Sequence, residues 1–386
     1  MNRRKTQRVA TVLSTGALIG AALAGCGDVT LDDDGVVAAG GSRQAIINGT
    51  ACDEAQEPTA VAIMLDASID FGQGAPFEIT QTSCTGTLIA PDVVLLAAHC
   101  LDLTTLTFGF GEVQRADFYV SFEADLSRFG AEQSLPLPES AIPTVARVAH
   151  DGFDLNSLGQ GTAGIESDIA LLFLAAPVEA VVPEVVLSRA EGERLSEGQA
   201  VTIAGWGQQV PTAGPFDPPP AGSVGIKVCG ASTIEELGEA LLQVGAGPET
   251  TRKCRGDSGG PTYAEVASSS SITRRVIGVT SRAYDQSDCN KGGVDTRVDY
   301  FASWIDDQMT SACADGTRTW CEVRGVLSAD DVAALTGAAP RSDDPADVDE
   351  DGGDDAGGPV SGCGATPAAL WASLGGLCAW RRRRRR

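Results

Sequence analysis

The chain has 386 residues, of which 43% are hydrophobic and 21% are charged. This composition is that of a globular protein with two or three folding units, and it excludes a chain that is disordered from end to end. The 28 basic and 52 acidic residues give a formal net charge of −24. That charge argues against nucleic acid as a partner, because phosphate binding needs a cationic surface.

The N-terminus predicts an exported protein. A basic start precedes a mostly apolar run that is too short for a comfortable membrane span, so we interpret residues 1–25 as a secretory signal peptide. The run ends in Leu23-Ala24-Gly25-Cys26, which resembles a bacterial lipobox and implies lipidation of Cys26. An ordinary signal peptide followed by an incidental cysteine is the alternative. We interpret residues 26–45 as a propeptide or linker.

Short apolar runs separated by Gly, Pro, Asp and Ser recur from residue 46 to about residue 300 and predict β-strands. Their lengths suit an all-β protein. The Pro-rich stretch Pro215–Pro220 is interpreted as an inserted loop. The predicted strands are Val61–Leu65, Thr87–Ile89, Val93–Ala97, Ile169–Leu174, Ala200–Ala204 and Val276–Thr280.

A glycine-flanked serine is the candidate nucleophile. Ser258 stands in Cys-Arg-Gly-Asp-Ser-Gly-Gly-Pro, where the backbone can approach a substrate carbonyl closely. A serine hydroxyl needs a base that is itself oriented by a third group. The chain has only two histidines, His99 and His150. We expect His150, in Val-Ala-His-Asp-Gly, to be a surface histidine near a turn.

The order of these residues separates two kinds of serine hydrolase. Gly256-x-Ser258-x-Gly260 also fits the nucleophile elbow of the α/β-hydrolases, in which the order is Ser, acid, His. Here both histidines precede Ser258, so that interpretation fails. The remaining order is His, Asp, Ser: His99 follows a buried-strand pattern, and Asp168 opens Asp-Ile-Ala-Leu-Leu.

Five spaced motifs resemble, in order, those of the trypsin-like serine protease family. The resemblance covers about residues 46–309 and implies an all-β fold of two six-stranded antiparallel β-barrels with a C-terminal helix around Val298–Met309. It implies a monomeric serine endopeptidase that acts on protein or peptide substrates through an acyl-enzyme, without a cofactor or metal. The motifs are Ile46–Gly49, Ala97–Cys100, Asp168–Leu172, Gly205–Gly207 and Gly256–Pro261.

The same resemblance assigns roles to residues. His99 is the general base and then the general acid, Asp168 holds its tautomer and stabilises the imidazolium, and Ser258 attacks the carbonyl. The backbone N–H groups of Gly256 and Ser258 form the oxyanion hole. The alternative function is a surface binding module on an inactive protease scaffold, which the presence of all these residues disfavours.

Activation by cleavage follows from the residue beside the nucleophile. In this fold Asp257 would be buried, and a buried lone charge is expensive. In the family a new α-amino group supplies the cation, and the matching residue here is Ile46. We therefore predict a zymogen that an activating protease cuts between Ala45 and Ile46. The family often has Arg before the new terminus, so Ala45 argues against self-activation with tryptic specificity.

The eleven cysteines of an exported chain predict disulfides rather than metal ligands. The resemblance pairs Cys84 with Cys100 and Cys254 with Cys289. The other partners stay open, with Cys52–Cys229 and a local Cys313–Cys321 bridge as the favoured pairs. Cys26 and Cys363 are left for processing.

The predicted substrate pocket departs from the common family pattern. Its floor lies six residues before the nucleophile, at Arg252, which Lys253 follows. A cationic floor repels a cationic side chain, so we predict that the enzyme is not specific for Arg or Lys. Either Arg252 binds a substrate carboxylate, giving a preference for Asp or Glu, or Asp295 neutralises Arg252, leaving a small or apolar preference. The pocket's other expected residues are Ser281, Arg282, Ala283 and Gly293.

The C-terminus contains a second predicted targeting signal. Residues 310–340 form an extension, and residues 341–361 form an acidic Asp/Gly-rich linker that cannot recover the entropy of ordering. Residues 362–386 contain Cys363, a short apolar stretch and six arginines, and resemble the C-terminal sorting tail of myxobacterial surface proteins. The resemblance implies cleavage near Cys363 and display on the cell surface or outer membrane, or release. A merely adhesive tail is the alternative.

Overall fold

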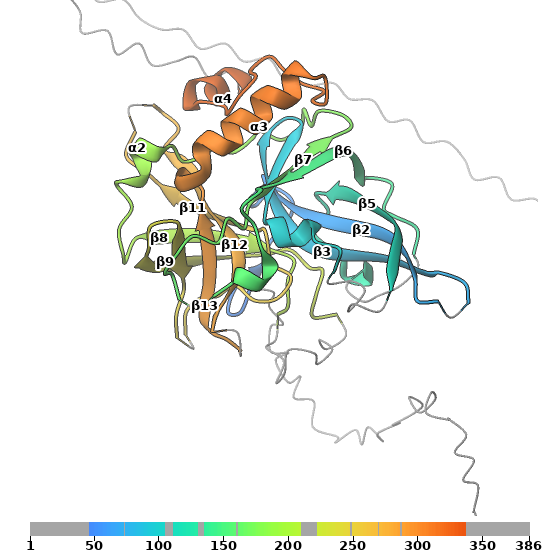
Figure 1. Cartoon of the computed structure of the whole chain (residues 1–386). Coiled ribbons are helices and arrows are strands. Elements are labelled where there is room, and N and C mark those ends of the chain that lie inside the picture. The colour runs from blue at the N-terminus through green and yellow to red at the C-terminus, as the bar shows by residue number, and fades with distance from the viewer. Residues whose placement is uncertain are drawn as a thin grey trace, which may run out of the picture. The chain divides into compact units, whose positions relative to one another are not determined.

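The computed structural model describes residues 46–336, apart from residues 73, 105–110, 130–134, 160, 210–221, 248, 269 and 286–287. The predictions for Cys26, Cys363, the linker and the tail lie outside the described residues. Two closed, six-stranded antiparallel β-barrels make up most of this part of the chain (Figure 1). The predicted fold class is therefore confirmed.

The first barrel is the ring β2-β3-β4-β7-β6-β5, closed by the pairing of β2 with β5. Alternate side chains of β2, such as Val61, Ile63 and Leu65, are buried in the barrel interior, as the two-residue period of a strand requires. The strands are β2 (Ala60–Asp70), β3 (Phe77–Ala90), β4 (Val93–Leu96), β5 (Glu112–Ser121), β6 (Ile142–Ala149) and β7 (Ala170–Leu174).

The second barrel closes because β8 pairs with both β9 and β11. The two-residue strand β1 (Thr50–Ala51) adds to the outside of β9. All six strands predicted from the sequence are present, in β2, β3, β4, β7, β8 and β12, although the predictions for β4 and β7 are each one residue too long. The strands of this barrel are β8 (Ala200–Gly205), β9 (Val228–Leu237), β10 (Leu241–Val244), β11 (Pro261–Glu265), β12 (Arg274–Asp285) and β13 (Asp288–Arg297).

Helices are few and short in the described chain. Helix α3 (Ala302–Ala314) starts after Val298 and continues beyond Met309, across the boundary that we predicted for the protease domain. No helix of the described chain is long and apolar enough to cross a membrane. The others are α2 (Arg189–Gly192), α4 (Ala329–Leu335) and the 3-10 turns η1 (Ala98–Leu101), η2 (Ser127–Phe129), η3 (Leu155–Ser157) and η4 (Asp299–Phe301).

The segment after α3 is packed into the body of the protein. Leu327 and Val332 join the same buried cluster as Leu95 of the first barrel and Ile305 of α3. A fully buried ion pair, Arg318 to Asp92 at 2.8 Å, ties this segment to the turn between β3 and β4. The described part of the predicted extension is thus held by both apolar burial and a buried charge pair.

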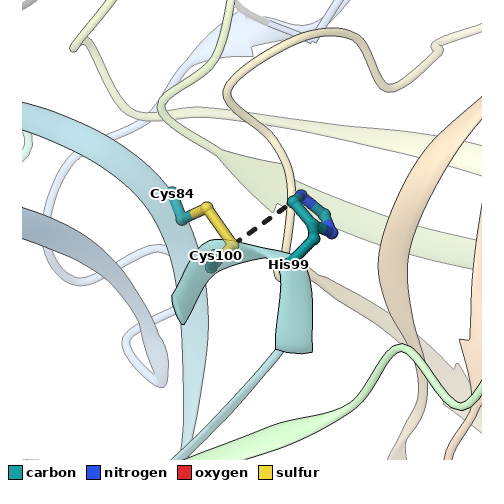
Figure 2. A group of neighbouring side chains, drawn as sticks. All are labelled: Cys84, His99 and Cys100. Carbon is teal, nitrogen blue, oxygen red and sulfur yellow. Dashed lines mark hydrogen bonds between the residues drawn. A yellow bond between two sulfur atoms is a disulfide. The ribbon is translucent and has the colours of Figure 1, made fainter. Parts of the chain in front are cut away.

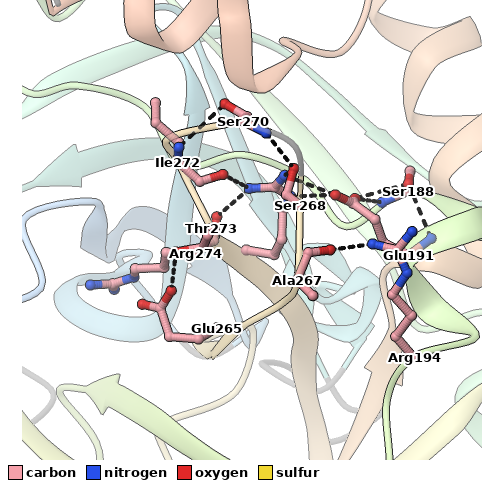
Figure 3. A network of polar contacts seen from close by, with 11 residues as sticks. Ser188, Glu191, Arg194, Glu265, Ala267, Ser268, Ser270, Ile272, Thr273 and Arg274 are labelled. Atoms are coloured by element: carbon pink, nitrogen blue, oxygen red, sulfur yellow. Dashed lines mark hydrogen bonds and ion pairs between the residues drawn. The ribbon is translucent and has the colours of Figure 1, made fainter. Parts of the chain in front are cut away.

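A polar network fixes α2 to the connection between β11 and β12 (Figure 3). Arg275, which is buried, donates to Glu191 Oε1 at 2.8 Å and to Ser268 Oγ at 3.3 Å. Arg194 donates to the carbonyl of Ala267. These contacts hold the connection between β11 and β12 against α2 and the residues that follow it.

Four disulfides cross-link the described chain. They include both pairs that the family resemblance implied and the two pairs that were favoured from the sequence, which are therefore confirmed. The pairs are Cys52–Cys229, Cys84–Cys100, Cys254–Cys289 and Cys313–Cys321.

Candidate active site

The register of two strands brings the candidate base and acid together. Leu96, at the end of β4, pairs with Ala170, at the start of β7. His99 follows shortly after β4 and Asp168 comes shortly before β7, so both lie at the same edge of the first barrel. Asp168 Oδ2 accepts from His99 Nδ1 at 2.8 Å, and Oδ1 accepts from the His99 backbone N–H at 2.9 Å. The carboxylate therefore fixes both the ring and the backbone of His99.

The second barrel holds this carboxylate from the other side. Asp168 is fully buried, and the Ser281 hydroxyl donates to its Oδ2 at 2.6 Å. The Thr296 hydroxyl donates to the Asp168 carbonyl at 3.0 Å. Ser281, which we predicted in the wall of the substrate pocket, instead completes the hydrogen bonding of Asp168. Sequence position alone does not show which face of β12 carries this hydroxyl.

The electrostatics suit His99 for general base catalysis. Burial alone would lower the pKa of His99, but the charge and hydrogen bond of Asp168, with a contribution from Asp102, raise that pKa above its ordinary value. The bond to Asp168 occupies Nδ1, which leaves Nε2 as the atom that can take a proton.

This shift predicts the pH dependence of activity. His99 accepts a proton only when its ring is neutral, so activity is lost as pH falls through its raised pKa. We expect kcat/KM for a peptide to show an acidic limb with a midpoint above 6.5, falling tenfold per pH unit below it. A pH series under kcat/KM conditions measures the midpoint, and a value at or below 6.5 contradicts the role of the Asp168 charge.

Ser258 is carried by the second barrel but is packed against the first. The N–H of Thr85, on β3, donates to the Ser258 carbonyl at 2.8 Å. Gly259 has φ +77°, and a Cβ there would lie 2.3 Å from the Thr85 carbonyl oxygen and 3.1 Å from the nitrogen of Ala97. Because Ala97 is two residues before His99, this contact packs the loop that carries Ser258 against the segment that carries His99. No hydrogen bond joins Ser258 to His99 in the described chain, as is common in uncomplexed enzymes.

The backbone before Ser258 has the shape that an anion site needs. Gly256 has φ +89°, and a Cβ there would lie 2.8 Å from Gly207 Cα, so only glycine fits. Within the described loop, the N–H groups of Gly256 and Ser258 are not donors in any backbone hydrogen bond, whereas Asp257 donates to the Cys254 carbonyl at 3.1 Å. Two such N–H groups, on either side of Asp257, can stabilise a developing oxyanion.

Asp257 and Ile46 are both buried. The Asp257 carboxylate accepts from the N–H of Cys254 at 2.9 Å and from that of Gly207 at 3.0 Å. Burial raises the pKa of Asp257 to about 7, although these hydrogen bonds and the charge of Lys253 oppose the rise. Ile46 packs into the second barrel's core with φ +45°. In the full-length chain Ile46 has a peptide nitrogen, so it offers Asp257 no charged partner.

A cavity of about 230 Å³ opens beside Ser258. The disulfide Cys254–Cys289 borders it. Of the predicted pocket residues, Lys253, Arg282 and Ala283 line it, whereas Arg252, Ser281, Gly293 and Asp295 are not among its lining residues. The cavity is lined by Leu158, Lys253, Cys254, Arg255, Ser258, Thr280, Arg282, Ala283 and Cys289.

Arg252, the predicted pocket floor, is not among the lining residues of this cavity. Arg252 donates to the carbonyls of Cys289 at 3.0 Å and Thr250 at 3.1 Å, and also to that of Gly247. Asp295 pairs with Lys253, at 2.7 Å, rather than with Arg252. Arg252 forms a β-bridge with Ile47, and in extended backbone successive side chains point to opposite sides. Lys253 therefore faces the cavity in its place.

An ion pair that the sequence did not indicate builds the cavity's outer wall. Arg282 donates to Glu166 from Nη2 at 2.6 Å and from Nε at 3.0 Å, and to the Gly161 carbonyl at 2.9 Å. Both charged side chains are buried. Because Glu166 satisfies the Arg282 guanidinium, this cation serves to hold the loop before Asp168.

One cluster has the spacing of a metal site but not its chemistry. Ligand atoms of Cys84, His99 and Cys100 lie within 4.8 Å of one another. Figure 2 shows that the two sulfurs are joined in a disulfide, and His99 Nε2 lies 3.9 Å from Cys100 Sγ. A disulfide supplies no thiolate for a metal, so the bridge instead braces the turn that carries His99.

His150 lies outside this site. Its Nδ1 accepts from the Gly152 N–H at 3.0 Å, and its ring packs against Phe301 and Trp304 with centroid distances of 5.2 and 5.1 Å. His150 thus lies at a turn, as predicted, but it is partly buried against the aromatic residues at the start of α3 rather than fully at the surface.

Comparison with known proteins assigns the family. The sequence profile of the Trypsin family matches residues 46–305, which is more than half of the chain. The chain belongs to the trypsin family. This trypsin-family protein is similar to kallikrein 1-related peptidase b3 of Mus musculus, with 26% identity over 71% of this chain and 94% of that protein.

Two further relatives have similar coverage. Proproteinase E of Bos taurus is 29% identical over 59% of this chain and 84% of that protein. Chymotrypsin-like elastase family member 1 of Homo sapiens is 29% identical over 59% and 82%. Family membership makes the protein a serine endopeptidase that acts on proteins, and the four disulfides fit an oxidising, extracellular compartment.

Proposed function

We propose that this trypsin-family protein is an exported serine endopeptidase that becomes active on cleavage before Ile46 and does not cut after Arg or Lys. The observation that carries the proposal is the buried Asp168, which holds His99 from the first barrel while Ser281 of the second barrel donates to the same oxygen. A site assembled in this way from two barrels is suited to acyl transfer.

The proposed reaction uses only residues of this chain and water. Ser258 Oγ attacks the peptide carbonyl while its proton passes to His99 Nε2, and the carbonyl oxygen becomes an oxyanion held by the N–H groups of Gly256 and Ser258. The C–N bond then breaks, and His99 returns the proton to the leaving amine. Water repeats the sequence on the ester, which frees the acid and restores the Ser258 hydroxyl.

The cavity argues against basic substrates. Lys253, Arg255 and Arg282 line it, and no carboxylate is among the residues that line it in the described chain. A cationic substrate side chain would enter without an acidic partner, and burying an unpaired charge is costly.

The burial of Asp257 supports activation by cleavage. Because its pKa is about 7, the Asp257 carboxyl is partly protonated and partly ionised near neutral pH. An α-amino group released at Ile46 would supply the missing cation and favour the charged form. Cleavage would thereby stabilise the loop that carries Gly256 and Ser258.

A fluorophosphonate probe tests this proposal, because it labels only an activated serine. We expect protein beginning at Ile46 to label at least about tenfold faster than the full-length chain, and Asp257→Asn to remove most of that advantage. Ser258→Ala is the control for labelling at other sites. Protein beginning at Ile46 that does not label would contradict the proposal and favour a binding module.

The same activation step has a signature in stability. The pKa of Asp257 is raised from 3.8 to about 7, so the uncut chain loses stability as pH rises through that window. In the cut chain, the proposed ion pair between the Ile46 α-amino group and Asp257 favours the charged carboxylate, so its unfolding free energy should fall less between pH 3.8 and about 7.

We further propose that the mature enzyme is displayed at or released from the cell surface. Lipid on Cys26 and processing at Cys363 within the tail 362–386 are the two anchoring routes, and cleavage before Ile46 would leave only the second. Mass spectrometry of both termini of the mature protein distinguishes these routes.

A further inference from the structure

A buried lysine is held at the inner side of the cavity. Lys253 is almost fully buried, and its Nζ donates to Asp295 Oδ2 at 2.7 Å and to Thr262 Oγ1 at 2.6 Å. The Thr262 hydroxyl in turn donates to the same Asp295 oxygen at 2.5 Å. The ammonium is therefore fixed in one position by a carboxylate that is itself fully buried.

The stem of Lys253 lies along one side of the cavity. A Cβ on Gly293 of β13 would be 3.2 Å from Lys253 Cβ and 3.6 Å from its Cδ, so the glycine leaves the room that this stem occupies. Lys253 lines the cavity, whereas Asp295 does not. A substrate side chain that enters beside Ser258 thus meets the lysine before it meets the carboxylate.

One hydrogen of the ammonium is left over. A lysine ammonium has three donors, and two of them are used by Thr262 and Asp295. No other hydrogen bond of Lys253 occurs in the described part of the chain. Because buried polar hydrogens are normally paired, we infer that the third donor is available to an acceptor brought by the substrate.

The charges around the cavity favour an acceptor that is negative. Its charged lining residues are all basic, and the carboxylates that pair with two of them, Glu166 with Arg282 and Asp295 with Lys253, are not among the lining residues. A substrate carboxylate would give Lys253 its third acceptor through a charge-assisted hydrogen bond, which is stronger than a neutral one. An amide oxygen could accept the same bond without the gain in charge attraction.

We propose that Lys253, oriented by Asp295 and Thr262, binds the side chain of the substrate residue before the scissile bond and gives the enzyme a preference for Asp or Glu there. This inference rests on the proposed endopeptidase function. It moves the recognition of a substrate carboxylate from Arg252, which is turned toward backbone carbonyls, to its neighbour.

The test compares fluorogenic peptides that differ only in the residue before the scissile bond, with Glu, Asp, Gln, Ala or Arg there. For the enzyme beginning at Ile46 we expect kcat/KM to be about 10- to 100-fold higher for Glu or Asp than for Gln, and lowest for Arg. Fastest cleavage after Ala, Gln or Arg would overturn the proposal.

Variants assign the preference to the lysine. Lys253→Met/Asp295→Asn removes both buried charges together, which avoids a lone carboxylate, and should reduce the Glu-to-Gln ratio to within about threefold of one. Lys291→Met is the matched control, because Lys291 has a 61% exposed side chain and is not among the cavity's lining residues. A double variant that keeps the wild-type ratio would overturn the role of Lys253.

Fluorophosphonate labelling separates the two proposals. An enzyme that labels but shows no acidic preference contradicts only the role of Lys253. An enzyme that neither labels nor cleaves any peptide of the series contradicts the endopeptidase function itself.

Discussion

Replacing Asp168 by Asn in the enzyme that begins at Ile46 is expected to lower kcat about 10⁴-fold, the loss that follows when the histidine takes the wrong tautomer. Asp168 Oδ2 accepts from His99 Nδ1 and from the Ser281 hydroxyl. An amide NH₂ in that place cannot accept and would itself donate to Nδ1. The ring proton then moves to Nε2, which can no longer take a proton from Ser258.

Steady-state kinetics on one peptide measure the loss, and thermal unfolding checks that the variant is folded. Asp151→Asn is the matched control, because Asp151 is an exposed carboxylate next to the other histidine. We expect the control to keep kcat within about twofold, because surface changes are usually small. If Asp168→Asn retained a tenth of the wild-type kcat, His99 would not depend on this carboxylate.

The contact between His99 and Asp168 could be predicted from the sequence because both residues lie in recognisable order beside strongly apolar segments. His99 and Asp168 each adjoin a short buried strand, and those two strands pair with each other. Buried strands are the segments whose pattern is clearest. Once the order of His, Asp and Ser had excluded the α/β-hydrolases, the rest of the fold followed from the family resemblance.

Strands that mix charged, polar or glycine residues with apolar ones lack the apolar pattern from which a strand can be predicted. β5 contains charged residues and is mostly exposed along its first half. β13 contains Gly292, which has φ +74° and lies so close to the β10 end that a Cβ there would be 1.5 Å from the Gly245 carbonyl oxygen. These segments are strands because their neighbours pair with them, and such tertiary context outweighs local propensity.

The pocket residues could be predicted only in part, because side-chain direction decides which of them line the cavity: Lys253, Arg282 and Ala283 do, and Arg252 does not. Arg252 and Lys253 are adjacent cations, and the sequence does not show which one lines the cavity. The β-bridge of Arg252 with Ile47 decides this, and it joins segments that are far apart in the chain. In extended backbone, neighbouring side chains point to opposite sides, so only one of the two cations can line the cavity. The sequence does not show which one, because it does not show that Arg252 pairs with Ile47.

The buried ion pair between Arg318 and Asp92 gives the largest expected effect on stability. Arg318 donates to Asp92 Oδ1 from Nη2 at 2.8 Å and from Nε at 3.1 Å, and the Trp320 N–H donates to Oδ2 at 2.8 Å. Arg318→Met would leave the carboxylate buried without its cation. Breaking a buried pair in this way costs about 3–5 kcal/mol of unfolding free energy.

Urea unfolding measures this cost, in a Ser258→Ala background that prevents self-digestion. Arg115→Met is the matched control, because Arg115 has a 42% exposed side chain and forms its ion pairs at the surface. Exposed pairs contribute about 0–1 kcal/mol. We expect Asp92→Leu/Arg318→Met to recover most of the loss, because a paired replacement leaves no lone charge. Equal destabilisation by Arg318→Met and Arg115→Met would show that the segment after α3 is held by its apolar contacts alone.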